Sequence, residues 1–408
     1  MRTKLPSMDI YLVGGAVRDT LLGLPVKDRD WVVVGASPQQ LLHAGYLPVG
    51  KDFPVFLHPV TRQEYALART ERNTAPGYKG FAFHAAPDVT LAQDLARRDL
   101  TINAMAVSLE QLDDHGNFDP ATVRLEDPFQ GLRDLRHRRL QHVTAAFAED
   151  PVRILRVARF AARFAQFHVS DATQDLMRRM VARGEVDALV AERVWQELAR
   201  GLMEHQPSHM LDVLRDCAAL GHLLPELAAA AAASPSSAAM VNLSLDNAAL
   251  RQMPLTVRFA ALALYMPDDA ARTRVCERLR VPNDCRDLAL LAARERTAVD
   301  NSGTLSAAAL LQLLERCDAL RKPARFHELL QLCAILAQTP AGADATDYRP
   351  MARLAAVLSA AQAVATDAIA RRVMAAGQSG AQVGEAIHAA RTDAIAAMLA
   401  GADALPAP

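Results

Sequence analysis

The chain has 408 residues, which is more than a single compact core usually holds, so we expect two to four modules. It is 51% hydrophobic and 22% charged, as globular proteins are, and its net charge of −1 gives no compositional sign of nucleic-acid binding. The five cysteines are isolated and form no Cys-x-x-Cys, which argues against a disulfide scaffold and a zinc site. The sequence shows no signal peptide and no apolar run long enough to span a membrane, so we expect a cytoplasmic protein.

The first predicted elements form a strand–turn–helix–strand unit. Two short apolar runs, Ile10–Val13 and Trp31–Val34, have the length and the β-branched content of buried strands. Between them lie Gly14-Gly15-Ala16-Val17-Arg18-Asp19 and a helical stretch at Thr20–Leu24. A glycine turn therefore stands directly between a predicted strand and a predicted helix.

Polar residues of this unit have the chemistry of a phosphate-transfer site. Asp28 and Asp30 lead into the second strand at alternate positions, so their carboxylates share one face and can converge on a divalent ion such as Mg²⁺. Gly15 lets backbone amides approach a triphosphate, and Arg18 can bind a phosphate through two hydrogen bonds. Each feature alone has a simpler interpretation, because paired glycines usually form only a turn and Asp-x-Asp usually lies in a solvated loop. Their order within one short unit favours phosphate chemistry.

This stretch resembles the signature of the class II nucleotidyltransferases, the family of bacterial tRNA CCA-adding enzymes and poly(A) polymerases. The family's first motif, Gly-Gly-x-Val-Arg-Asp followed by Asp-x-Asp, corresponds here to residues 14–19 and 28–30. The resemblance implies a polymerase-β-like nucleotidyltransferase head with a small mixed sheet. It also implies that Asp28 and Asp30 are catalytic residues and Mg²⁺ ligands, and that Gly15 and Arg18 bind the nucleotide.

Two further strands are expected at Val55–His58 and Gln63–Ala68. Glu64 lies on the second of them. With Arg69 it matches a Glu-x-x-x-x-Arg pattern in which the family commonly carries a third catalytic carboxylate. A solvated strand residue is an equally good interpretation of Glu64, so both stay open.

The polar segment 71–88 is interrupted by prolines and glycines, and we expect a mobile loop there. In CCA-adding enzymes a loop of this placement helps to switch specificity from CTP to ATP. Adjacent arginines beside an aspartate are usually a surface ion cluster, but residues 97–103 resemble the family's second motif, Arg-Arg-Asp-x-Thr-Ile-Asn. That resemblance assigns Arg98 to the nucleotide phosphates and gives Asp99 and Asn103 an orienting role. Residues 127–135 match the next motif, a turn that links the head to the following module.

From about residue 150 onward the sequence is helical. Pro151 stands in the first turn of a predicted helix, and Asp150 is well placed to cap it. Arg153, Arg156 and Arg159 recur at helical spacing, which by itself predicts a solvated basic face. The resemblance implies more, because in the family an Asp-x-x-Arg pair presents hydrogen-bonding groups to the edge of cytosine or adenine. Asp150 and Arg153 would then read the base, with Arg156 as a further nucleotide contact.

The resemblance extends to about residue 225 and weakens beyond it. Glu192–Leu198 matches the last family motif, which braces the nucleotide-binding helix. An alanine run with Ser-Pro-Ser-Ser at Ala228–Ala239 is typical of a linker or a frayed helix. Further helices are expected at Leu255–Leu264, Asp269–Leu279, Arg286–Ala298, Ala307–Ala319, Ala324–Ala337, Met351–Ala370 and Gly380–Leu399.

Relatives from gamma-proteobacteria often carry a His-Asp phosphohydrolase domain in this region, and this chain does not carry its signature. It contains no His-Asp dipeptide, and no histidine between His222 and His327. Val257–Leu262 resembles the approach to that dipeptide, but the chain continues Ala263-Leu264-Tyr265. We therefore expect a degenerate region at about 240–340 without a phosphohydrolase site.

These expectations combine into an α+β protein with a nucleotidyltransferase head (1–140), a helical neck with the nucleotide-recognition motif (141–227) and a helical body and tail for tRNA docking (228–408). The implied reaction is template-independent addition and repair of the 3′-terminal CCA of tRNA from CTP and ATP, with Mg²⁺ and release of pyrophosphate. No membrane is involved, and a monomer or weak homodimer is expected. Poly(A) polymerase, an enzyme adding only CC or only A, and a non-catalytic RNA-binding protein remain as alternatives.

Overall fold

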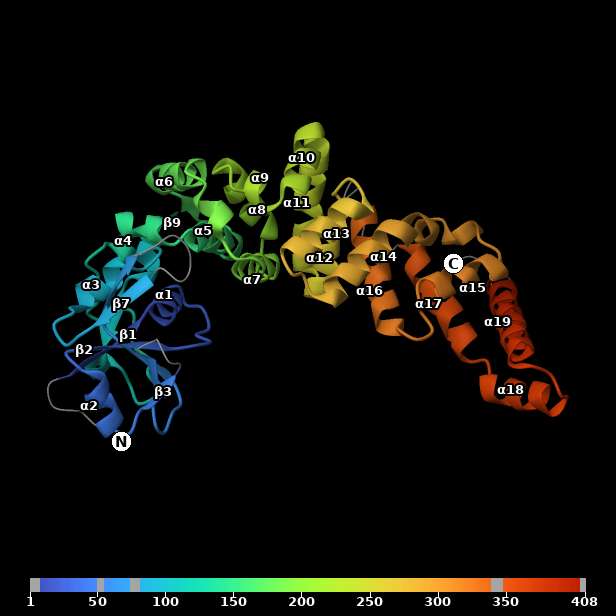
Figure 1. Cartoon of the computed structure of the whole chain (residues 1–408), viewed down its shortest axis with the longest axis horizontal. Helices are drawn as coiled ribbons and strands as arrows, with labels where there is room; N and C mark the ends of the chain where they lie inside the picture. The colour runs from blue at the N-terminus through green and yellow to red at the C-terminus, as the bar shows by residue number, and fades with distance from the viewer. Residues whose placement is uncertain (1–7, 50–54, 74–80, 339–347, 404–408) are drawn as a thin grey trace. The chain divides into compact units, whose positions relative to one another are not determined.

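The computed structural model of the chain describes residues 8–49, 55–73, 81–338 and 348–403 (Figure 1). It divides into two compact units, Met1–Leu223 and Leu224–Pro408, which we call the first and the second unit. The expected head and almost all of the expected neck, 141–227, lie in the first unit.

A six-stranded mixed sheet forms the core of the expected head. Its strand order is β3-β4-β5-β2-β1-β8, with β2 and β5 parallel and the other neighbours antiparallel. The strands are β1 (Asp9–Val13), β2 (Asp30–Val34), β3 (Leu47–Val49), β4 (Val55–Leu57), β5 (Glu64–Leu67) and β8 (Ala106–Ser108). The predicted mixed sheet and the four strands predicted in it are confirmed, whereas β3 and β8 were not predicted.

The sheet presents two different faces. On one face Asp30 of β2 is paired with Val13 of β1, and Val32 with Tyr11, beside a buried apolar cluster that includes Val13 and Val32. On the other face Trp31 and Tyr65 stack with ring centroids 5.4 Å apart and 8° between their planes. This stack links the parallel strands β2 and β5, so their first residues lie on the opposite face, at the same edge of the sheet.

Two further strands form a separate two-stranded sheet in the first unit. β6 (Arg69–Asn73) and β7 (Phe81–Ala85) pair in antiparallel register. The loop predicted at 71–88 is therefore wrong over these strand residues, because backbone pairing forms a hairpin where polar residues and the intervening prolines and glycines suggested none. The centre of the predicted loop, 74–80, lies outside the described residues.

The helices of the first unit connect the sheet to an all-helical part. They are α1 (Gly15–Leu21), α2 (Pro38–His43), α3 (Leu91–Ala96), α4 (Gly131–Arg136), α5 (Val152–Arg163), α6 (Asp171–Ala182), α7 (Ala191–Leu202), α8 (Pro207–Asp216) and α9 (Leu220–Leu223). Two-residue strands β9 (Arg139–Leu140) and β10 (His168–Val169) pair in parallel among them. Most of α5 is buried, and it packs against α7 and α8, so its charged residues are held in place by an apolar core.

A capped helix holds the segment 99–103 in position. The carboxylate of Asp127 accepts hydrogen bonds from the backbone amides of Gly131 (2.6 Å) and of the next residue (2.9 Å) at the start of α4. Asp134 of α4 accepts a hydrogen bond from the Thr101 hydroxyl at 2.7 Å. A Cβ on Gly131 would lie 2.2 Å from the Thr101 carbonyl oxygen, so this close approach requires glycine.

The described residues of the second unit are helical. Its helices are α10 (Pro225–Ala233), α11 (Pro235–Leu250), α12 (Leu255–Ala263), α13 (Asp269–Arg278), α14 (Asn283–Asp300), α15 (Ala307–Arg316), α16 (Pro323–Gln338), α17 (Arg349–Gln362), α18 (Thr366–Ala375) and α19 (Gly380–Asp403). Of the two alternatives expected at Ala228–Ala239, a linker or a frayed helix, the structure has helices, because alanine is the strongest helix former and the Ser234 hydroxyl caps α11.

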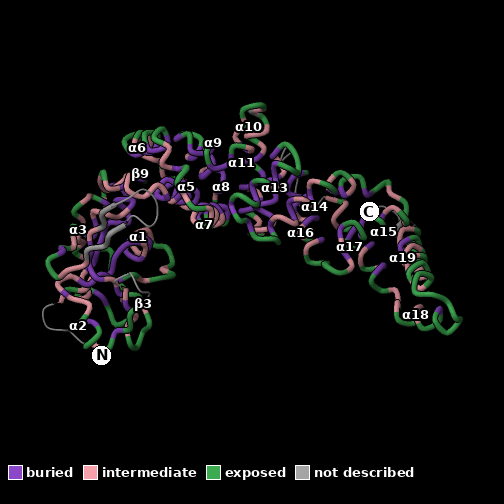
Figure 2. The backbone as a smooth tube through the Cα atoms, in the orientation of Figure 1, coloured by how far each residue is buried: buried purple, intermediate pink, exposed green. Residues whose placement is uncertain are grey.

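The single helix predicted at Met351–Ala370 is wrong, since α17 ends at Gln362 and α18 begins at Thr366. The stretch Arg349–Ala375 is long and apolar enough to span a membrane, with a mean hydropathy of 1.2. It consists, however, of the two separate helices α17 and α18. Most residues of α18 and many residues of α19 are exposed (Figure 2).

An arginine of α13 binds the backbone at the end of α12, in the region where the sequence lacks a His-Asp dipeptide. The buried guanidinium of Arg272 donates to the backbone carbonyls of Ala263 (3.0 Å), Leu264 (3.2 Å) and Met266 (2.8 Å). Among the residues that the structure describes, no group of three or more His, Cys, Asp or Glu side chains is placed to hold a metal ion. The carbonyl groups at this helix end are thus satisfied by the protein itself.

Candidate nucleotide site

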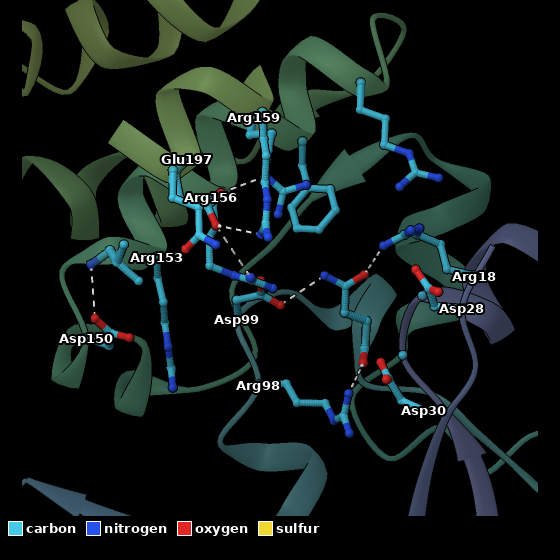
Figure 3. Close-up of a pocket in the computed structure, with 18 of the residues that line it drawn as sticks. Arg18, Asp28, Asp30, Arg98, Asp99, Asp150, Arg153, Arg156, Arg159 and Glu197 are labelled. Carbon is cyan, nitrogen blue, oxygen red and sulfur yellow. Dashed lines mark hydrogen bonds and ion pairs between the residues drawn. The ribbon is translucent and has the colours of Figure 1, made fainter. Parts of the chain in front are cut away.

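A cavity of about 720 Å³ lies in the first unit, lined by the glycine turn, the residues before β2, the segment 97–103 and one side each of α5 and α7 (Figure 3). Charged side chains dominate its wall. The basic residues are Arg18, Lys27, Arg97, Arg98, Arg153, Arg156, Arg159, Arg163, Arg193 and Arg200, and the acidic residues are Asp19, Asp28, Asp30, Asp99, Asp150 and Glu197. The excess of positive charge suits a polyanionic ligand.

The glycine turn brings a cation and a carboxylate to the same space. Gly14 has φ 72°, and a Cβ there would lie 2.9 Å from Nη1 of Arg98 and 4.0 Å from Oδ2 of Asp30. Arg98 makes only long contacts of 3.5 Å, to the Asn103 carbonyl and to an aspartate of α3, and its buried Nε has no hydrogen-bond partner among the described residues. Gly15 also lines the cavity. Donors of Arg98 therefore remain available to an anion beside this turn.

Asp28 and Asp30 have the features of cation ligands. Both are exposed and line the cavity, and neither accepts a hydrogen bond or ion pair from a residue that the structure describes. Glu64 is exposed, begins β5 and lies on the same sheet face as Asp30, but it does not line the cavity. Hard divalent cations take carboxylate oxygens and complete their coordination with water and phosphate, so this donor set fits such an ion.

Arg18 is more deeply engaged than the sequence suggested. It is 3% exposed, and its guanidinium stacks on the rings of Phe160 and Phe164 at 5.2 and 5.0 Å. It donates to Asp19 at 2.8 and 2.9 Å and to the side-chain oxygen of Asn103. Burial lowers the pKa of Arg18, and the adjacent carboxylate opposes that change. Arg18 therefore joins the glycine turn to α5 as well as lining the cavity.

Asp99 is buried and forms hydrogen bonds both within the head and to α5. Its carboxylate accepts hydrogen bonds from Nδ2 of Asn103 (2.9 Å), the amide of Leu100 (2.8 Å) and Nε of Arg156 (2.8 Å). Burial alone would raise the pKa of Asp99, but the charge of Arg156 and these hydrogen bonds hold it far below its usual value. Asp99 in turn raises the pKa of Arg156. The expected orienting role of Asp99 and Asn103 has this geometric basis.

Asp150 and Arg153 both line the cavity. Asp150 accepts a hydrogen bond from the amide of Val152 at 3.1 Å, consistent with its expected capping role, and it forms a two-point ion pair with Arg193 of α7. Arg153 is 7% exposed and donates to the carbonyls of Ala146 (3.0 Å) and Arg97 (2.6 Å).

One side of α7 lines the cavity, whereas the sequence indicated only that this helix supports the nucleotide-binding helix. Arg193, Gln196, Glu197 and Arg200 all line the cavity, at the spacing of a single helix face. Glu197 is 5% exposed and accepts a hydrogen bond from Arg159 of α5 at 2.6 Å. Their spacing was the available signal, but only the fold reveals that this face meets the stripe of arginines on α5.

Comparisons with known proteins agree with this architecture. Residues 10–141 match the family described as the poly A polymerase head domain, and residues 166–231 match the probable RNA and SrmB-binding site of polymerase A. The multifunctional CCA protein of Variovorax paradoxus is 53% identical over 417 residues, which cover 96% of this chain and 100% of that protein.

Two solved structures have the same fold. A CCA-adding enzyme in complex with CTP has a TM-score of 0.65 and 22% identity, covering 95% of this chain and 86% of that one. The Thermotoga maritima CCA-adding enzyme in complex with tRNA has a TM-score of 0.63 and 22% identity, covering 97% of this chain and 92% of that one.

The head, the site and these relatives together define a nucleotidyltransferase. The chain belongs to the class II family of tRNA CCA-adding enzymes and poly(A) polymerases, whose members generally use a divalent metal ion.

Proposed function

We propose that this chain adds and repairs the 3′-terminal CCA of tRNA, using CTP and ATP without a nucleic-acid template and releasing pyrophosphate. The observation that carries the proposal is one cavity with Asp28, Asp30 and Arg98 on one side and Asp150 and Arg153 on the other (Figure 3). This arrangement offers separate places for the reacting phosphate and for the base of one nucleotide. Full-length similarity to multifunctional CCA proteins supports the choice of reaction.

Asp28 and Asp30 would hold Mg²⁺, with Glu64 as a further catalytic carboxylate beside Asp30. When bound, the ion activates the attacking hydroxyl and stabilises charge on the leaving phosphates. The carboxylates of Asp28 and Asp30, which have no partner among the described residues, support this assignment, and Glu64 acts from the neighbouring strand.

The triphosphate would lie against Gly15, Arg18 and Arg98. Arg98 supplies hydrogen-bond donors that make only long contacts within the described part of the chain, and Gly15 keeps the backbone accessible to a ligand. Arg18 contributes mainly through its positive charge and its hold on the turn, because its hydrogen bonds go to Asp19 and Asn103.

Asp150 and Arg153 would read the base, and Arg156 would contact the nucleotide from the next turn of α5. Cytosine and adenine both carry an exocyclic amino group that can donate to a carboxylate. The cavity positions of Asp150, Arg153 and Arg156 support these roles.

The remaining proposals concern the whole chain. The head, 1–140, performs the chemistry, the neck, 141–227, selects the nucleotide, and the body and tail, 228–408, dock the tRNA. The enzyme works in the cytoplasm as a monomer or weak homodimer, and the region 240–340 has no phosphohydrolase site.

Nucleotide incorporation on three tRNA transcripts, ending before CCA, after C and after CC, tests the proposal. Each is offered Mg²⁺ with CTP, ATP or both, and products are resolved at single nucleotides. All three should stop cleanly at CCA. Long A tails would instead identify a poly(A) polymerase, addition at only some stages a partial adder, and tRNA binding without incorporation a non-catalytic RNA-binding protein.

A further inference from the structure

The carboxylate of Asp150 is held from two sides. Arg193 of α7 donates Nη2 to Oδ2 at 2.8 Å and Nη1 to Oδ1 at 3.2 Å, while the amide of Val152 donates to Oδ1 at 3.1 Å. The side chains of Arg193 and Asp150 are 27% and 17% exposed. A parallel two-point contact between a guanidinium and a carboxylate fixes the plane of the carboxylate as well as its position.

These contacts leave Asp150 little remaining capacity. An ionised carboxylate offers about four acceptor positions, and three hydrogen bonds reach Asp150 from the described protein. One position therefore remains for a donor arriving in the cavity, and its direction is set by Arg193. Without Arg193 the carboxylate would rotate about its side chain and could turn toward Arg156, whose charge already acts on it electrostatically.

Arg193 is itself well supported. It lies on α7 beside Val194, Glu197 and Leu198, which are buried, so the helix that carries it is packed into the core. Asp150 belongs to a different segment, directly before α5. The ion pair therefore connects the segment before α5 to α7, and it fixes the orientation of the Asp150 carboxylate relative to the packed helix α7.

We propose that Arg193 is the positioning residue for base selection, which it performs by aligning the last free acceptor position of Asp150 with the amino group of cytosine or adenine. This inference rests on the proposed reading of the base by Asp150. An ionised carboxylate can only accept, so it attracts the N4 amino group of cytosine and the N6 amino group of adenine and repels O4 of uracil and O6 of guanine. A misaligned carboxylate loses that distinction without losing the metal site.

Single-nucleotide incorporation with the full-length enzyme tests this role. The kcat/KM values for CTP and UTP are measured on tRNA ending before CCA, and those for ATP and GTP on tRNA ending after CC. Arg193→Ala should raise the UTP:CTP and GTP:ATP ratios about tenfold, the effect of one lost charge-assisted hydrogen bond. Arg193→Lys should restore part of the discrimination, because an ammonium keeps the charge but cannot form the parallel two-point contact. The Mg²⁺ concentration for half-maximal rate should not change in either variant.

Arg215→Gln is the matched control. Arg215 also forms an arginine–aspartate ion pair, with Asp212 at 2.7 Å, but this pair is exposed and does not line the cavity. Its removal should leave both ratios at their normal values.

A second comparison separates this inference from the proposed function. Asp150→Asn should itself weaken discrimination, and adding Arg193→Ala to it should cause little further change if Arg193 acts through Asp150. If Asp150→Asn weakens discrimination but Arg193→Ala does not, the role of Arg193 is refuted while base reading stands. If Asp150→Asn leaves both ratios unchanged, base reading by Asp150 is refuted and the inference with it. Thermal unfolding of each variant shows that the folded enzyme is being compared, and a ratio that rises equally in Arg215→Gln would also overturn the proposal.

Discussion

Asp99 and Arg156 are joined by a 2.8 Å ion pair that connects the segment after α3 to the middle of α5. This contact lies within a longer charged chain. On one side Asn103 joins Asp99 to Arg18 of the glycine turn, and on the other Arg156 approaches Glu197 of α7 at 3.9 Å. The residues around the proposed triphosphate and those around the proposed base are thereby held by one network.

We expect Asp99→Asn to lower the free energy of unfolding by about 2–4 kcal/mol at pH 7, because it removes the carboxylate that Arg156 contacts most closely. The pKa of Asp99 is depressed in the folded state, so its stabilising effect is complete above the unfolded value of about 3.9 and is lost as the pH falls toward the folded value. Urea unfolding at pH 7 and near pH 3.5 should therefore give a larger difference between the wild type and the variant at pH 7. An equal difference at both pH values would contradict the assignment.

Gly14→Ala should impair catalysis more than it impairs folding. The methyl group would strain a residue with φ 72° and would lie 2.9 Å from Nη1 of Arg98, so Arg98 must move. We expect kcat/KM to fall at least about tenfold for both CTP and ATP, with a stability loss of about 1–2 kcal/mol. Gly23→Ala is the control, because Gly23 has φ 68° and open space around its ideal Cβ. It should lose similar stability and keep its activity; parallel losses of activity would refute the steric argument.

Asp28→Ala and Asp30→Ala should each abolish nucleotide transfer while leaving tRNA binding intact. Both carboxylates are exposed to the cavity and have no protein partner among the described residues, so their removal costs little stability. Incorporation assays and filter binding of labelled tRNA measure the two properties separately. Glu64→Gln should reduce the rate less than either change, because Glu64 lies outside the cavity lining. Substantial transfer by either alanine variant would eliminate the proposed metal role.

Arg153→Ala should blur the choice between CTP and ATP more than it changes the metal requirement. Its guanidinium also bonds the carbonyls of Ala146 and Arg97, so we expect a stability loss of about 2 kcal/mol as well. The CTP:ATP preference on each transcript and the Mg²⁺ dependence of the rate provide the measurement. An unchanged preference in a folded variant would restrict Arg153 to a structural role.

The full-length protein should hydrolyse no phosphodiester. The chain has no His-Asp dipeptide, and Arg272 bonds the carbonyls at the end of α12. Incubation with 2′,3′-cyclic AMP and added Mg²⁺, Mn²⁺ or Ni²⁺ should give no product above background. Hydrolysis that a chelator stops would contradict this prediction.

Much of the head was predictable because its central strands are short apolar runs bounded by glycine, proline and charged residues. The strands β6 and β7 were missed because β6 is polar and the prolines and glycines around and between the two strands are typical of a loop. The helices α10 and α11 could not be distinguished from a linker, since an alanine- and serine-rich run with a proline has the composition of a linker and the propensity of a helix.

The sequence predicted which residues form the candidate site, but not which residues they contact. Asp28, Asp30 and Arg98 lie together as their order suggested. The partner of Asp150 could not be inferred, because Arg193 is 43 positions away in sequence and only the packing of α5 against α7 brings it close. Burial of Arg18 was equally hidden, since its two phenylalanine neighbours are on α5 and just beyond its end.

The stack of Trp31 on Tyr65 has a spectroscopic consequence. The chain contains two tryptophans, Trp31 directly after Asp30 and Trp195 directly before Gln196, and both belong to the first unit. Tryptophan fluorescence, excited at wavelengths where tyrosine does not absorb, therefore reports on the first unit alone, whereas far-ultraviolet circular dichroism reports on the helices of both. Emission recorded during denaturation or during titration with nucleotide would follow the catalytic half of the protein without any introduced label.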